Sequence, residues 1–157
     1  MFLEHLWQLS YDSKTIDVLR NAKYAIPFIQ SLHLFGLTLV LGSVLAFNLR
    51  LLGFGMSKLT MPVLVKPLWR IAIWGLLLSI FTGIIVFIPD PARYAANIAF
   101  KTKLVVLLLA IVFHFTIFKR AVRTDEPGLR RNAIVAAVSL TLWFCVGWAG
   151  RAIAFLG

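Results

Sequence analysis

Long apolar stretches alternate with short polar segments along this chain. Uncharged runs extend over residues 24–49, 71–88, 104–118 and 132–150. A helix needs about 20 mostly apolar residues to cross the hydrocarbon core of a bilayer, and each run reaches that length with help from its flanks. The period-two alternation of a membrane β-barrel is missing. The pattern therefore predicts four spanning helices, over residues 24–49, 68–88, 98–119 and 132–154.

The connections between the runs are short, so consecutive helices are expected to be antiparallel neighbours. Asp90-Pro91 is typical of a helix start, because Asp caps and Pro loses nothing in the first turn. Pro62 and Pro67 are expected in the first loop, and Glu126-Pro127-Gly128 is expected to form a tight turn. Residues Met1–Leu9 are predicted to form a short interfacial helix. The predicted fold is thus an all-α, up-down four-helix membrane bundle, a single domain over residues 1–157.

Composition supports a membrane protein. The chain is 61% hydrophobic and 14% charged, with a mean hydropathy of +0.90. A soluble domain of this size has too much surface to hide so many apolar residues. The single cysteine, Cys145, excludes an intrachain disulfide and the Cys-x-x-Cys-His signature of covalent haem.

The basic residues indicate contact with lipid and an orientation. The net charge is +10, but the 16 Lys and Arg residues lie between apolar runs. They are expected to anchor helix ends at phospholipid headgroups, so the bilayer is the expected partner and nucleic acid is not. Nine of the 16 fall in the first and third loops. The positive-inside rule then places those loops in the cytoplasm of a bacterial inner membrane, with both termini outside.

Small residues recur at four-residue spacing in the second run, at Gly75, Ser79 and Gly83. Small residues on one stripe let helix backbones approach closely in a membrane. Packing within the bundle explains this stripe. A homodimer face, or a docking face for a larger membrane complex, remains an alternative.

Ionisable residues are scarce within the runs. No Asp or Glu lies between Asp17 and Asp90, or between Asp90 and Asp125. A cation-coupled transporter usually needs a carboxylate at depth, so this class is disfavoured. The chain also lacks HExxH and a Gly-rich phosphate loop, and a Ser-His-Asp triad has no buried acid to complete it. An enzyme is therefore not expected.

Two histidines lie within the apolar runs, His33 and His114. Neutral imidazole is a common haem ligand, so both are candidate axial ligands of haem b in an electron-transfer protein. Their depths differ by about 11 residues, or roughly 16 Å. One haem is therefore not expected to bind both within one subunit. Two alternatives remain open: a separate haem at each histidine, or a twofold dimer in which His33 meets His33 of its partner.

A second constellation is predicted near the midplane, at the depth of His33. Thiolate and imidazole ligands suit copper, so a soft-metal site is an alternative use of it. The residues expected to line this small polar pocket are Gln30, Thr82, Thr141, Cys145, Trp148 and Arg151.

Three segments carry a family resemblance. They are Ile26-Pro27-x-x-Gln30-x-x-His33-x-x-Gly36, Pro91-x-x-Tyr94-x-x-Asn97-x-x-Phe100-Lys101-x-Lys103 and Gly150-Arg151-x-Ile153-Ala154. Together they resemble an uncharacterised family of bacterial four-helix inner-membrane proteins, which implies four spans and no particular activity. The family pattern has Glu where this chain has Gln30, and Asp where it has Asn48. Any role of those acids in the family is therefore altered or lost in this chain. A looser likeness of fold type connects the chain to copper-resistance-D-like proteins and membrane b-type cytochromes.

Three functions follow from these observations. The first is haem b binding with an electron-transfer role. The alternative is a non-enzymatic accessory subunit or binding protein of a membrane complex, with a packed helix face that docks a partner. The third is a transporter of a small solute such as an anion, attracted by the outer cations Arg93, Lys101, Lys103 and Arg151.

Overall fold

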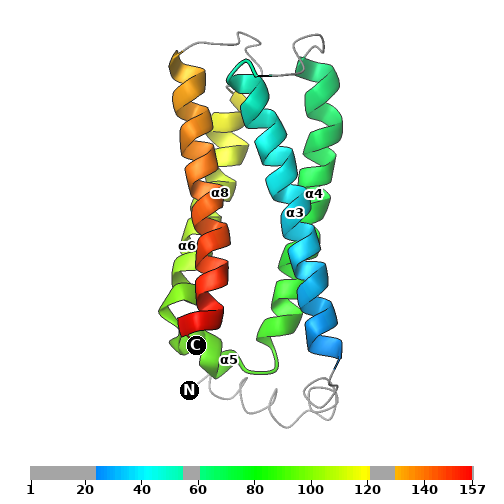
Figure 1. Ribbon diagram of the computed structural model, residues 1–157, viewed down its shortest axis with the longest axis vertical. Helices are drawn as coiled ribbons and strands as arrows, with labels where there is room; N and C mark the ends of the chain where they lie inside the picture. Colours follow the sequence, from blue (N-terminus) through cyan, green and yellow to red (C-terminus); the bar gives the residue numbers. More distant parts are fainter. Residues whose placement is uncertain (1–23, 55–60, 121–129, 157) are drawn as a thin grey trace.

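The computed structural model describes residues 24–54, 61–120 and 130–156, and in these residues the long elements are all helices (Figure 1). The interfacial helix expected at Met1–Leu9 and the turn expected at Glu126-Pro127-Gly128 lie outside the described residues. In chain order, the elements are α3 (Ala25–Leu51), α4 (Met61–Phe87), α5 (Pro91–Ala96), α6 (Ile98–Phe113), the π-helix η1 (His114–Phe118) and α8 (Arg130–Leu156).

Four helical segments are long and apolar enough to cross a membrane: Ala25–Leu51, Val63–Phe87, Ile98–Phe118 and Arg130–Ile153. The prediction of an all-α bundle of four helices able to span a membrane is therefore confirmed. One boundary differs, because α4 begins at Met61 and runs through both prolines expected in the loop. Pro62 lies in the first turn, where its missing N–H costs nothing. Pro67 costs one intrahelical hydrogen bond, which a long apolar helix tolerates.

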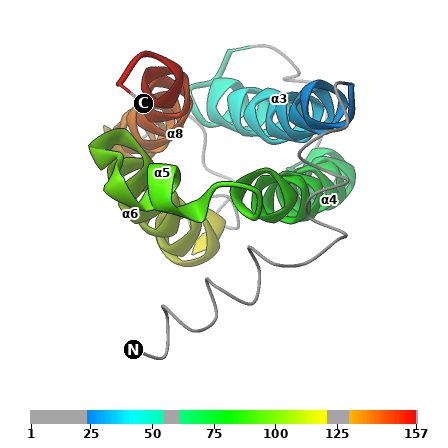
Figure 2. The same ribbon diagram turned by 90° about the horizontal axis from the view of Figure 1, so that it is seen from below.

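The four long helices run alternately up and down (Figure 1). Seen end-on, they occupy the corners of a bundle in the order α3, α4, α6, α8 (Figure 2). Close backbone approaches join α3 to α4, α6 to α8 and, less extensively, α3 to α8. Although α4 and α6 are neighbours in the end-on view, they are not among the closely packed pairs. The bundle therefore consists of two tight antiparallel pairs, joined along α3 and α8.

Small residues make the α3–α4 contact close. Side chains added at Gly36 or Gly75 would collide with the opposite helix, and Ser79 Oγ donates a 3.2 Å hydrogen bond to the carbonyl oxygen of His33. The small-residue stripe of the second span therefore packs against α3 within this chain. Its use as a docking face for another subunit is not needed to explain it.

The apolar core fills the middle of the bundle and the end at which Leu51 lies. One cluster of buried residues includes Phe47, Leu51 and Phe118, and a second includes Val44 and Trp143. The opposite end, where α5 crosses the bundle, instead carries the polar cavity described below. We call it the α5 end.

Two caps build the α5 end. The Asp90 side chain accepts a 3.3 Å hydrogen bond from the Arg93 N–H, and Pro91 occupies the first turn of α5, so the predicted helix start is confirmed. The spanning helix α6 begins at Ile98, after a break at Asn97. There Asn97 Oδ1 accepts hydrogen bonds from the N–H groups of Ala99 (2.8 Å) and Phe100 (3.3 Å). This break in the helix places the α5 side chains over the end of the bundle.

Candidate functional site

The α5 end contains a cavity of about 570 Å³, which we call the basic cavity. It is bounded by α3, α4, α5, α6 and α8. Its apolar walls include Leu37, Phe87 and Phe100, and three of its lining residues are the glycines Gly83, Gly147 and Gly150. The polar side chains that line it are Gln30, His33, Arg93, Tyr94, Asn97, Lys103 and Arg151.

His33 is held in a fixed orientation by α4. Its Nδ1 lies 2.8 Å from the carbonyl oxygen of Ser79 and 3.3 Å from Thr82 Oγ1. A carbonyl oxygen only accepts, so Nδ1 carries the proton and donates it to Ser79. The lone pair of the neutral ring is then on Nε2. A Cβ added at Gly83 would lie 3.2 Å from His33 Cε1, so a larger residue at this position would crowd the imidazole.

Lys103 reaches His33 from the opposite side of the bundle. Its Nζ lies 3.4 Å from His33 Nε2, across 70 positions of sequence. Lys103 is only partly exposed, whereas Arg93 and Arg151 are exposed around the same cavity. Among the described residues that line the basic cavity there is no Asp or Glu. The described lining is therefore basic, a property that suits an anionic group.

An apolar chamber of about 380 Å³ also borders the His33–Lys103 contact. Its lining residues come from α3, α4, α6 and α8, and α4 and α6 are the neighbouring helices that do not pack closely. Its walls include Leu76, Ile80, Leu104 and Trp143. The residues shared by the chamber and the basic cavity are His33, Leu37, Gly83, Phe87, Phe100 and Lys103. The contact between His33 and Lys103 thus lies where a polar and an apolar compartment meet.

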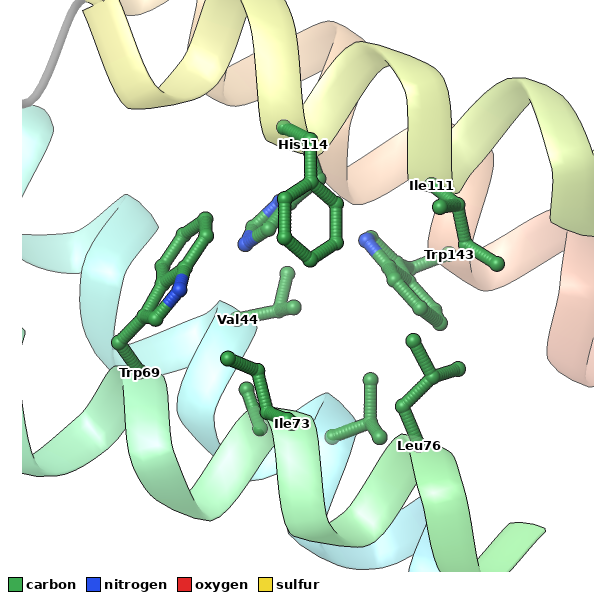
Figure 3. A pocket seen from close by; sticks show the side chains of 10 residues that line it. Val44, Trp69, Ile73, Leu76, Ile111, His114 and Trp143 are labelled. Atoms are coloured by element: carbon green, nitrogen blue, oxygen red, sulfur yellow. The ribbon is translucent and has the colours of Figure 1, made fainter. Parts of the chain in front are cut away.

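His114, the first residue of η1, occupies a different environment, in which Trp69 and Trp143 lie on either side of it (Figure 3). It is 5% exposed and nearly parallel to the rings of Trp69, at 5.2 Å, and Phe118, at 4.4 Å. Trp143 meets it edge-on at 6.2 Å. The adjoining cavity of about 20 Å³ has room for one water molecule. Neither ring nitrogen has a hydrogen-bond partner among the described residues.

The two histidines line different cavities. Among the cavities described above, His33 borders the basic cavity and the apolar chamber, and His114 borders the small cavity of Figure 3. This separation agrees with the depth difference expected from the sequence. Within the described part of the chain, no group of three or more His, Cys, Asp and Glu residues is close enough to hold a metal ion.

The expected midplane pocket is only half assembled. Gln30 and Arg151 line the basic cavity with His33, and Thr82 contacts the imidazole. By contrast, Thr141 and Trp148 line a shallow groove on the outside of α3 and α8, and Cys145 is exposed. Trp143 and Val146 are the buried residues of this turn, and Cys145 follows Trp143 by two positions, which is about 200° around a helix. The soft-metal pairing of Cys145 with His33 is therefore not formed in this structure.

Arg93, Tyr94, Asn97 and Lys103 line the basic cavity but were not among the predicted pocket residues, and Lys103 is the one that contacts His33. A lysine near a helix end is usually interpreted as a side chain that extends to the headgroups. A signal was nevertheless present, because Lys103 lies on the same helical stripe as Leu107, Ala110 and His114, of which Ala110 and His114 are buried. Lys101, two positions earlier, is on the exposed side.

Comparisons with known proteins agree with the family resemblance. A model of a protein family described as a family of unknown function, DUF6644, matches residues 8–156. No curated protein and no solved structure matches the chain. The looser likeness to copper-resistance-D-like proteins and b-type cytochromes therefore gains no support. With the match covering nearly the whole chain, this four-span protein belongs to the DUF6644 family.

Proposed function

We propose that this protein binds haem b at the α5 end, with His33 Nε2 as an axial ligand of the iron. The orientation of His33 carries this proposal. Histidines that bind metals usually donate their other ring N–H to a carbonyl or carboxylate, which fixes the tautomer and aims the ligating nitrogen. The 2.8 Å contact between His33 Nδ1 and the Ser79 carbonyl is a bond of this kind, and it leaves Nε2 toward the cavities.

The two compartments match the two sides of a haem. Haem b has an apolar macrocycle with two carboxylates at one edge. The basic cavity offers Arg93 and Arg151 to these propionates, and guanidinium groups pair well with carboxylates. The apolar chamber offers Leu76, Ile80 and Leu104 to the opposite edge. His114 is not needed, because it lies outside both compartments.

The proposal includes a cellular setting and a role. We assign the protein to a bacterial inner membrane with both termini outside, because the basic residues are more numerous in the first and third loops, and the basic cavity would then face the periplasm. A haem held there by His33 would supply one-electron transfer between an external donor and an external acceptor. The protein tunes such a centre through its axial ligands and their hydrogen bonds.

The visible spectrum of the purified protein tests this proposal. Protein from haem-replete cells is expected to show a Soret band and a pyridine haemochrome spectrum of haem b. His33→Ala should lose the pigment, and His114→Ala is the matched control that should keep it. A colourless wild-type protein contradicts the proposal. If a folded, monodisperse His114→Ala protein loses the pigment and His33→Ala keeps it, the haem ligand is His114 and the assignment to His33 is wrong.

A small organic or inorganic anion is a second candidate ligand. The specific observation is the convergence of Arg93, Lys103 and Arg151 on a cavity to which the described residues contribute no acid. This candidate predicts a colourless protein that carries radiolabelled phosphate or acetate across liposome membranes. Replacing the three cations with glutamine should abolish that flux. An unchanged flux in the triple variant, compared with Lys101→Gln, would exclude it.

A further inference from the structure

Lys103 is the nearest nitrogen donor to His33 Nε2 among the hydrogen bonds of the described residues, at 3.4 Å. Its position is set by the inward stripe of α6, and its carbon chain lies against Gly150 of α8, where an added Cβ would be 3.4 Å from Lys103 Nζ. The glycine therefore leaves space for the lysine stem to cross toward α3. Lys103 and His33 approach each other from opposite sides of the bundle.

We propose that Lys103 Nζ is the second axial ligand of the haem iron, opposite His33 Nε2. This inference rests on the proposed haem site. A metal–nitrogen bond is about 2 Å long, so two nitrogens on opposite sides of one iron are about 4 Å apart. The observed separation is 3.4 Å. An extension of the lysine chain by about half an ångström therefore converts the hydrogen-bond contact into an axial pair.

The proposed haem plane lies between these two nitrogens, where the two cavities meet. The basic cavity and the apolar chamber both border the His33–Lys103 contact and share the residues around it. A flat ring inserted between the two nitrogens extends into both compartments. Its carboxylate edge then meets Arg93 and Arg151, and its apolar edge meets the wall that includes Leu104.

Charge balance is also satisfied. A metal ligand must be deprotonated, so binding of Lys103 releases one proton from its ammonium group to solvent in the basic cavity. The propionates keep Arg93 and Arg151 as partners. Filling both axial positions leaves the iron without an open site. This arrangement fits an electron carrier better than a centre that binds oxygen.

Four variants test the inference through the spin state of the ferric protein. The wild type is expected to be low-spin and six-coordinate. Lys103→Ala and Lys103→Arg should be high-spin with haem retained. Alanine has no nitrogen to bind the iron, and the arginine guanidinium stays protonated and cannot bind it either. Lys103→His should restore the low-spin state. Lys101→Ala is the matched control on the exposed side of α6, and it should resemble the wild type.

Near-infrared magnetic circular dichroism of the wild type identifies its axial pair without any substitution, so the test does not depend on the folding of a variant. A histidine–amine signature supports the inference. A high-spin wild type, a bis-histidine signature, or a Lys103→Ala protein that stays low-spin overturns it while leaving haem binding intact. A wild type without haem instead overturns the proposed function itself.

Discussion

Gly36 and Gly75 bring the backbones of α3 and α4 into direct contact, since a Cβ added at Gly75 would lie 2.7 Å from the Gly36 carbonyl oxygen. Lipid tails are as apolar as leucine, so close packing of this kind is a main source of helix association in membranes. Gly75→Ala must separate the two helices. We expect it to lower the free energy of unfolding by about 1–3 kcal/mol, the usual cost of overpacking, measured by denaturation in detergent.

Gly42→Ala is the matched control for this prediction. It lies on the same helix as Gly36, but an added Cβ meets nothing within 4 Å. Alanine favours a helix over glycine by about 1 kcal/mol, so this variant should be as stable as the wild type or slightly more so. Equal destabilisation by Gly42→Ala and Gly75→Ala would show that the α3–α4 approach is not responsible.

A buried hydrogen bond links α3 to α8 and gives a second prediction. Asn48 Nδ2 donates to Ser139 Oγ at 3.1 Å, and both residues are fully buried. Hydrogen bonds between membrane helices contribute about 0.6 kcal/mol on average. Ser139→Ala and Asn48→Leu should therefore show a coupling of this size in a double-mutant cycle of unfolding. A coupling indistinguishable from zero would mean that the two side chains do not interact in the membrane.

The four spans were predictable because a membrane permits few structures. Backbone groups in hydrocarbon must be paired internally, so long apolar runs become helices. The inward face of each helix was harder to predict. In water the apolar face of a helix is buried, but in lipid both faces are apolar and the pattern loses this information. For this reason Cys145 and Trp148 were expected in a pocket, whereas the structure exposes both and buries Trp143.

The candidate site was predictable where chemistry alone singled out a residue. His33 is a rare polar side chain in an apolar run, and it lines the basic cavity at the α5 end. Lys103 could not be assigned in this way, because lysines near helix ends normally extend to the headgroups. Its relation to His33 depends on the packing of α6 opposite α3. Such a contact between distant residues is visible only in the folded chain.

The environment of His114 gives a third prediction. Its two ring nitrogens are buried without a hydrogen-bond partner among the described residues, while its ring stacks with Trp69 and Phe118. An unsatisfied buried polar group costs about 1–3 kcal/mol. His114→Phe keeps the stacking and removes the polar atoms, and the adjoining cavity of about 20 Å³ provides space. We expect this variant to unfold at a higher temperature than the wild type and to retain haem.

His114→Ala is the comparison for this variant, because it also removes the nitrogens but leaves a void and loses the stacked ring. It should be less stable than His114→Phe. If His114→Phe is destabilised instead, the imidazole has a polar partner in the membrane, and one water molecule in the small cavity is the simplest such partner.

The arginines of the basic cavity give the last prediction, which rests on the proposed haem site. Arg93 and Arg151 both line the cavity, and the Arg151 guanidinium lies 5.2 Å from the centre of the Phe155 ring. A hydrogen bond to a charged group contributes about 1.5–3 kcal/mol, and the lower value suits these exposed side chains. Because 1.4 kcal/mol is a factor of ten in affinity, Arg93→Gln and Arg151→Gln should each weaken haem binding about tenfold. Titration of the apoprotein with haemin measures this change.

Lys101→Gln removes the same charge from the exposed face of α6 and should leave the affinity unaltered. If all three variants bind haemin equally well, the propionates do not lie in the basic cavity and the haem would have to be oriented the other way.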